Sequence, residues 1–368
     1  MIAPLVNSFG LELAEDVISK ENIPPYDVAI RDGWAIATGD KHYPLKQPAI
    51  VNGEGPKYLE VNSYCWINTG GYLPQRADAV VADKEPSDEE FGKDTYPLEN
   101  VLPKGTEWQK GDLILKAGTV LEAAQQALLF EAGIQEVSVY KRPSVAILAT
   151  GHEIVEAGSE IKKGRHSSNA TYLSNLLNGL GLTDTAIFFA KDSAVEISSR
   201  LISLGEYFDF IITVGGTGQG KSDMLRKAMK MAGASVNKDG TRLSSSLPFV
   251  YGKMNKSILI GLPGNPLGFI CLAQRLVLPQ IWSSFMSSPL PVKKIDVVMG
   301  FNFQGKAGDI CVQLAPLGET MIALPLQKGS GRSASFRDAQ AIIKNPTGQR
   351  LNANQTVEAE LFFNGFHF

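Results

Sequence analysis

The residues best suited to chemistry form a glycine-rich segment followed by a lysine, a serine and an aspartate. Gly215, Gly216, Gly218 and Gly220 precede Lys221, Ser222 and Asp223. Glycines accept positive φ and let an anion approach backbone N–H groups, and the positive end of a following helix adds to that attraction. The segment therefore predicts a site for phosphate, pyrophosphate or carboxylate, with a point charge from Lys221. Asp223 also suits a purely structural role as a helix cap.

Residues 215–222 also match G-x-x-x-x-G-K-[ST], the phosphate-binding loop of nucleotide triphosphatases, with Lys221 and Ser222 in the lysine and magnesium-ligand places. Two features oppose that interpretation. The loop follows the third predicted strand of its domain, not the first, and the next strand runs into Leu-Pro-Gly without a carboxylate. A P-loop nucleotide-binding enzyme is therefore the lesser alternative.

Polar residues follow the other predicted strands of the same region. His152 and Glu153 follow one strand, Asp192 follows another, and the turn 262–266, LPGNP, follows a third. The carboxyl ends of parallel strands meet at one edge of a sheet, so these loops are expected to lie together. Glu153 and Asp192 could then hold a divalent cation, and His152 could act as a base. The simpler alternative is two solvated loop acids and a hydrogen-bonded structural histidine.

The elements that position these loops alternate between strand and helix over residues 143–286. Apolar runs at 144–150, 185–190, 208–214 and 257–262 predict strands, and helical spacing covers Thr171–Gly179, Ala194–Leu204, Asp223–Ala232 and Leu267–Phe285. This alternation predicts a doubly wound parallel α/β sheet. Residues 26–103 predict a small β-domain inserted between 1–25 and 104–142, where a helix covers Ala123–Ala132. Residues 287–368 return to short strands and predict a terminal β-domain.

Composition and charge limit the classes of protein to which this chain can belong. The 368 residues are 44% hydrophobic and carry a net charge of −3, which gives no electrostatic case for nucleic acid or a membrane surface. No apolar run approaches the roughly twenty residues of a membrane span, and the N-terminus does not resemble a signal peptide, so a cytoplasmic location is expected. Cys65, Cys271 and Cys311 are far apart in the sequence and are expected to be separate buried hydrophobes in a reducing compartment.

Five ordered segments resemble motifs of the molybdopterin molybdenumtransferase family, which includes MoeA in bacteria and the C-terminal domain of gephyrin in animals. The matching strings are IPPYDVAIRDGWAI, INTGGYLPQRADAVVADKE, LATGHEIVEAG, FIITVGGTGQGKSD and GLPGNPLGFICLAQRLVLPQI. The resemblance implies an elongated two-part N-terminal region, a molybdopterin-binding α/β domain and a C-terminal β-barrel. It also implies a homodimer, with the molybdopterin adenylyltransferase as a further partner.

The implied reaction inserts molybdate into adenylylated molybdopterin and releases AMP. By resemblance, the catalytic residues are Asp32, Thr69, Glu153, Asp192 and Asp223. Glu153, Asp192 and Glu107 are implied ligands of Mg²⁺. The implied pterin-binding residues are Gly215, Gly216, Gly218, Gly220, Lys221, Ser222, Asn169, Pro263, Gly264, Asn265 and Pro266.

Several positions differ from the family pattern. His152 and Ser167 stand where the family has aspartates, Gly218 replaces a serine, and residues 243–248, including Ser244, Ser245 and Ser246, lack the family's lysines. These changes remove metal-binding and anion-binding groups together, so weak transferase activity is expected. The alternative is a non-catalytic member that binds molybdopterin or serves as a scaffold.

Overall fold

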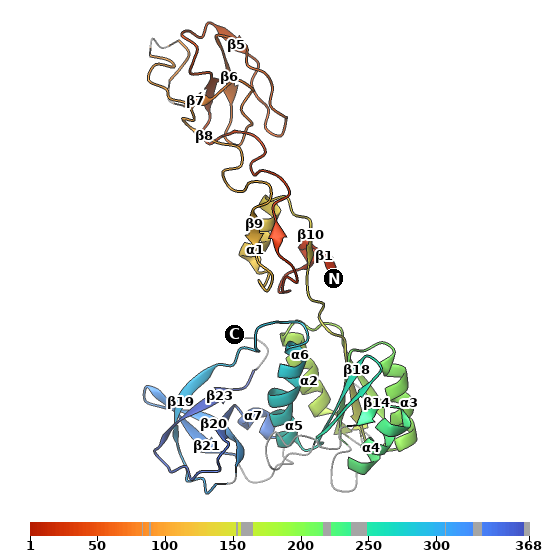
Figure 1. Cartoon of the computed structure of the whole chain (residues 1–368). Coiled ribbons are helices and arrows are strands. Elements are labelled where there is room, and N and C mark those ends of the chain that lie inside the picture. Colours follow the sequence, from red (N-terminus) through yellow and green to blue (C-terminus); the bar gives the residue numbers. More distant parts are fainter. Residues whose placement is uncertain are drawn as a thin grey trace. The chain divides into compact units, whose positions relative to one another are not determined.

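In the computed structural model, four apolar segments form the parallel centre of a six-stranded sheet (Figure 1). They are adjacent in the order β14 (Thr185–Ala190), β11 (Val145–Thr150), β15 (Phe210–Val214) and β18 (Ser257–Leu262). Every residue of β11 and β15 is buried, as expected for strands covered on both faces. The predicted doubly wound parallel arrangement is therefore confirmed.

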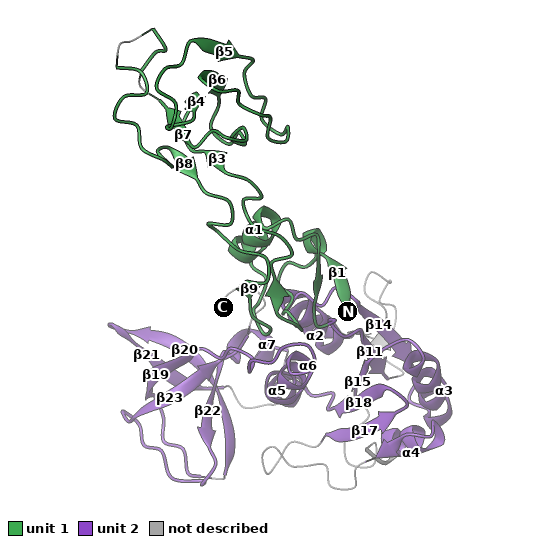
Figure 2. Cartoon of the chain, turned by 45° about the horizontal axis from the view of Figure 1, so that its top comes forward, with its two compact units in different colours: residues 1–140 green, residues 141–368 purple. Residues whose placement is uncertain are grey.

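The structure describes residues 1–82, 84–87, 90–151, 154–155, 165–215, 222–236, 249–305, 307–326 and 333–363. The chain divides into two compact units, residues 1–140 and 141–368 (Figure 2). The six-stranded sheet belongs to the second unit.

One edge of this sheet is antiparallel, which the sequence did not predict. Strand β17 (Val250–Met254) pairs antiparallel with β18, and β16 (Ser235–Val236) pairs antiparallel with β17. A two-residue turn joins β17 to β18, and its first residue, Asn255, has a φ of 51°. Asparagine accepts positive φ more readily than most residues, so it favours this tight hairpin.

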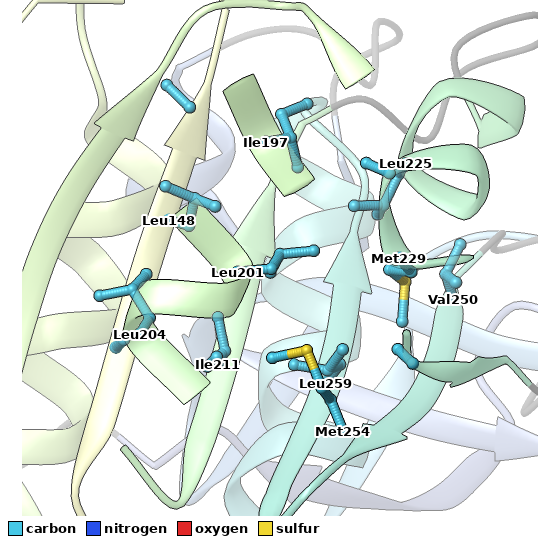
Figure 3. Packing of buried hydrophobic residues seen from close by; sticks show 14 residues of the cluster. Leu148, Ile197, Leu201, Leu204, Ile211, Leu225, Met229, Val250, Met254 and Leu259 are labelled. Carbon is cyan, nitrogen blue, oxygen red and sulfur yellow. The ribbon is translucent and has the colours of Figure 1, made fainter. Parts of the chain in front are cut away.

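Two helices cover one face of the sheet. On α3 (Ala194–Gly205) and α4 (Ser222–Met231), apolar side chains at helical spacing point toward the strands. Figure 3 shows Leu201 and Leu204 from α3 and Leu225 and Met229 from α4 packed with side chains of the sheet, among them Leu148. This core fixes the strands whose carboxyl ends carry the predicted loops.

Two further helical stretches belong to this domain, one before β14 and a longer one after β18. Helix α2 (Ser168–Gly179) contacts β11, β14 and α5. The predicted helix from Leu267 to Phe285 is instead three successive segments: α5 (Pro266–Leu272), the π-helical turn η2 (Ala273–Val277) and α6 (Leu278–Trp282). The π turn lies just before Pro279, which has no N–H to donate and would clash with a regular preceding turn.

The C-terminal strands form the closed barrel that the family resemblance implied. Its order is β19 (Lys294–Met299), β21 (Thr320–Pro325), β20 (Gly308–Leu317), β22 (Ala341–Asn345) and β23 (Thr356–Leu361), with the short α7 (Ser335–Asp338) beside it. From η2, the Arg275 side chain lies 3.2 Å from Asp309 and 3.1 Å from Glu360 of the barrel. These partly buried ion pairs connect the barrel to the α/β domain.

Residues 1–140 fold into two regions, with one buried apolar cluster in the first and two in the second. The first includes β1 (Ile2–Pro4), η1 (Leu5–Asn7), β2 (Val17–Ile18), β9 (Leu113–Leu115), α1 (Ala123–Glu131) and β10 (Glu136–Ser138). The second has the sheet β5 (Leu45–Gln47), β6 (Ser63–Ile67), β4 (Gly33–Ile36) and β7 (Ala79–Val81), together with β3 (Val28–Ala29) and β8 (Val101–Leu102). As predicted, α1 is followed by a positive-φ glycine, Gly133.

Two of the three cysteines differ from what the sequence led us to expect. The sulfur atoms of Cys271 on α5 and Cys311 on β20 are paired, which corrects the expectation that they are separate residues, whereas Cys65 is unpaired and buried. Pairs between cysteines distant in sequence depend on tertiary packing, which spacing does not reveal.

Among the described residues, no helix is long and apolar enough to cross a membrane.

Candidate functional site at the carboxyl edge of the sheet

The ends of β11, β14, β15 and β18 form one edge, called here the carboxyl edge. Thr150 ends β11, and its hydroxyl donates to the carbonyl of Val214 at the end of β15, over 3.3 Å. The N–H of Gly151 donates to the carbonyl of Ala190 at the end of β14, over 3.2 Å. These bonds hold three strand ends in register, so the loops that follow start from fixed positions.

Gly215, the first residue of the predicted anion loop, has a conformation that requires glycine. Its φ is +101°, and a Cβ atom there would lie 2.9 Å from the carbonyl oxygen of Thr150. Its N–H donates to the carbonyl of Leu262 at the end of β18, over 3.0 Å. The chain thus enters the loop in a conformation that other residues would adopt only with strain.

The turn after β18 approaches this glycine closely. A Cβ atom on Gly264 would lie 3.6 Å from the Cα atom of Gly215, which is ordinary van der Waals contact. The next residue, Asn265, caps α5 by accepting a bond of 2.8 Å from the N–H of Gly268, and Pro266 occupies the first turn. Asn265 and Pro266 thus have a structural function, and exposed Gly264 leaves its backbone uncovered.

Asn169 joins helix α2 to this turn. Its side-chain N–H donates to the carbonyl of Gly264 over 3.1 Å, and this bond fixes the orientation of the amide. The side chain is only 6% exposed, and its Oδ1 atom has no hydrogen-bond partner in the described part of the chain. A buried acceptor without a donor is costly, so it favours a ligand or water that brings an N–H or O–H group.

The N-terminus of α2 has neither a side-chain cap nor an acid in its first turn. Ser167, the residue before the helix, makes no capping bond with its side chain. The helix has 12 residues, so its first N–H groups carry the positive end of a substantial dipole. An anion binder and an orphaned acceptor therefore lie within one turn of α2.

Asp192 follows β14 at the same edge and is half-buried. The Glu196 carboxylate, in the first turn of α3, accepts from the N–H of Lys191 over 3.0 Å and so fixes the loop that carries Asp192. Other predicted residues of this unit, among them Glu153, Gly216, Gly218, Gly220, Lys221 and the altered His152 and Ser244 to Ser246, lie outside the described residues. Ser222 and Asp223 lie in the first turn of α4.

Asp32, Thr69 and Glu107 belong to residues 1–140, and the first two contact each other. Thr69 donates to the Asp32 carboxylate from its backbone N–H, over 2.6 Å, and from its hydroxyl, over 2.9 Å. These two bonds, the backbone bond first, hold the pKa of Asp32 below its usual value. Glu107 is exposed in a separate loop, where its N–H donates to the carbonyl of Ile23 over 3.0 Å.

The local backbone explains why Asp32 and Thr69 meet. A Cβ atom on Gly33 would lie 2.9 Å from the Val80 side chain and closer still to the Val81 carbonyl, so this position requires glycine. Gly70 follows Thr69 with a φ of +83°, and its N–H donates to the Ala29 carbonyl over 2.8 Å. Asp32 is exposed and ionised at neutral pH.

Sequence reasoning missed one residue beside the carboxyl edge. His166, on the short strand β13 (Arg165–His166) that pairs with β12 (Ile154–Val155), has a buried Nδ1 atom without a partner in the described residues. A histidine three positions before Asn169 was the available signal.

Comparison with known proteins identifies the family of this fold. The model of the MoeA N-terminal region, domains I and II, matches residues 2–133, and that of the probable molybdopterin-binding domain matches residues 146–282. Together these models cover the greater part of the chain. The chain belongs to the MoeA family. The resemblance first inferred from motifs is confirmed.

Relatives and solved structures agree with this assignment. The molybdopterin molybdenumtransferase of Haemophilus influenzae is 28% identical over 95% of this chain and 90% of its own. That of Staphylococcus aureus strain COL is 32% identical over 71% of this chain and 66% of its own. A crystal structure of the molybdopterin biosynthesis MoeA protein of Pyrococcus horikoshii has a TM-score of 0.76 at 27% identity, covering 98% of this chain and 94% of that one.

Proposed function

We propose that this chain is a molybdopterin molybdenumtransferase, which inserts molybdate into adenylylated molybdopterin and releases AMP. The named relatives support the reaction class. In the molecule itself, one observation carries the proposal: the orphaned Asn169 acceptor beside the uncapped start of α2. A phosphorylated pterin offers both an anion for the helix and ring N–H donors for the amide oxygen.

Each described group at the carboxyl edge has a task in this proposal. The N–H groups at the start of α2 bind phosphate oxygens, and Asn169 Oδ1 accepts from the pterin. Gly215 and Gly264 carry no side chain, so the ligand can approach their backbone. The proposal includes anion binding by Gly216, Gly218, Gly220, Lys221 and Ser222, which complete the predicted loop.

The acid groups are assigned by resemblance. Asp32 with Thr69, and Glu153, Asp192 and Asp223, are the proposed catalytic residues. Asp32 is ionised at neutral pH, so it can accept a proton or attract a cation.

Magnesium is the proposed metal, with Glu153, Asp192 and Glu107 as ligands. The described residues contain no group of three potential ligands, and Asp192 alone is too few for an ion that takes about six oxygens. AMP release measured after EDTA treatment, and again after Mg²⁺ is restored, tests whether the metal is required.

We also propose a cytoplasmic homodimer that works with the molybdopterin adenylyltransferase. Exposed apolar side chains near the N-terminus support self-association, since Ile2, Val6 and Phe9 are 65%, 68% and 61% exposed. Sedimentation at micromolar concentration tests the dimer, and a monomer would contradict it.

The test of function measures AMP release from adenylylated molybdopterin with molybdate and Mg²⁺. Asn169→Ala should lower the rate at least tenfold, because the pterin loses a buried hydrogen bond. Asn175→Ala is the matched control, since this asparagine is exposed on the same helix. Pterin binding without AMP release would support the non-catalytic alternative, and an Asn169→Ala rate equal to wild type would contradict the assigned site.

A further inference from the structure

A cavity of about 370 Å³ lies within residues 1–140 and has no role in the function proposed above. Seven residues line it: Lys20, Glu21, Asn22, Pro25 and Tyr26 from the segment that precedes β3, together with Lys104 and Lys110. Three lysines and one glutamate leave a net charge of +2 around the cavity. The chain as a whole carries −3, so this is a local concentration of positive charge in an acidic protein.

The cavity has two walls, residues 20–26 and residues 104–110, and hydrogen bonds fix the backbone of both before any ligand arrives. Ile23 and Trp108 exchange backbone bonds of 2.7 and 3.2 Å between the walls. The Asn22 side chain accepts from the N–H of Lys110 over 2.8 Å, and the Asp27 side chain accepts from the N–H of Lys104 over 2.7 Å. The lysine backbones are thus held in place, and only their side chains lose freedom on binding.

None of the three ammonium groups has an ion-pair partner in the part of the chain that the structure describes. This holds for Lys20, Lys104 and Lys110 alike, although Glu21 lines the same cavity. Three like charges against one carboxylate in the lining repel one another, and a bound anion relieves that repulsion. The cavity is therefore suited to a ligand with at least one phosphate or similar group.

The size of the cavity and its aromatic lining add a second requirement for the ligand. A cavity of this size lies in the range that holds small organic molecules, and a lone oxyanion would fill only a fraction of it. Tyr26 supplies an aromatic surface that is 43% exposed, with the ammonium of Lys104 6.0 Å from the ring centre. We propose that this cavity binds an organic phosphate with a planar ring, the phosphate on the lysines and the ring against Tyr26.

The proposal is tested on the full-length protein by calorimetric titration with AMP, adenosine and inorganic phosphate. AMP should bind at least tenfold more tightly than either fragment, and its affinity should fall as salt is raised. The double substitution Lys104→Gln and Lys110→Gln should weaken AMP binding at least tenfold, because two charged hydrogen bonds are lost. Tyr26→Leu should weaken AMP several-fold and leave phosphate unchanged.

The matched control is Lys41→Gln with Lys116→Gln, which removes the same charge from two exposed lysines outside the cavity. This control should bind AMP as the wild type does. Asn169→Ala separates the cavity from the carboxyl edge and should retain AMP binding, whatever its effect on transferase activity. Equal binding of phosphate and AMP, loss of AMP binding in Asn169→Ala, or equal weakening by both lysine pairs would overturn the proposal.

Discussion

Gly215→Ala is the substitution with the most definite physical consequence at the carboxyl edge. Two effects act together, because alanine is strained at a φ of +101° and its Cβ atom would lie 2.9 Å from the Thr150 carbonyl oxygen and 3.0 Å from the Thr150 hydroxyl. The first effect costs about 1–3 kcal/mol and the second about 1–3 kcal/mol. The smaller unfolded-state entropy of alanine offsets about 0.4–1 kcal/mol of this.

The net loss of about 2–5 kcal/mol is a large part of the roughly 5–15 kcal/mol that stabilises a typical protein. The urea dependence increases with protein size and should be about 3 kcal/mol per molar here, so the unfolding midpoint of Gly215→Ala should fall by roughly 1–2 M. Unfolding followed by circular dichroism measures this shift in the purified protein.

Gly264→Ala is the matched control, because its new Cβ atom would meet only the Gly215 Cα atom, at 3.6 Å. Its unfolding midpoint should stay close to the wild-type value. The reasoning is refuted if Gly215→Ala unfolds at the wild-type urea concentration, or if both alanine variants are destabilised equally.

Four further outcomes are expected. Thr69→Val should raise the pKa of Asp32 toward its usual value, measured by NMR titration, because the variant loses the hydroxyl bond; since the folded pKa is lowered, the stability that this carboxylate contributes is present above the unfolded pKa and lost as pH falls through the folded pKa. Cys65 should resist iodoacetamide in the native protein at pH 8 and react after unfolding, because burial raises its pKa to about 11 and keeps the thiol protonated. His152→Asp should raise the rate of AMP release, because it restores a carboxylate where the family has one, and a fall in rate would show that this histidine has a task of its own. Lys221→Ala should weaken pterin binding by about 1–3 kcal/mol in calorimetry, while tight magnesium-dependent ATP binding without pterin affinity would contradict the assigned ligand.

The sequence predicted the elements well where one pattern dominated. The apolar runs of β11, β14, β15 and β18 and the helical spacing of α3 and α4 depend on local periodicity, and each lies within a few residues of its predicted position. The π turn before Pro279 and the antiparallel pairing of β16 and β17 were not predicted. Their geometry depends on packing against neighbouring elements, which periodicity does not encode.

The candidate site was predictable as a set of loops but not as a set of contacts. The rule for parallel sheets placed the ends of β11, β15 and β18 at one edge, as observed. It could not predict that Asn169 would bond Gly264 and that its oxygen would have no partner among the described residues. That arrangement depends on side-chain orientation over a sequence separation of 95 residues.

The contact between Asn169 and Gly264 also bears on whether residues 215–222, which match the P-loop motif, form a nucleotide site. In a magnesium-dependent nucleotide site, a strand beside the loop ends in an acid that orients the metal, as expected for that fold class. Of the two strands beside β15, β18 ends at Leu262 and is followed by Pro263 and Gly264. The Gly264 carbonyl is bonded to Asn169 instead. The local chemistry at this strand end is thus an amide facing a glycine turn, which suits recognition of a hydrogen-bonding ring better than orientation of a metal.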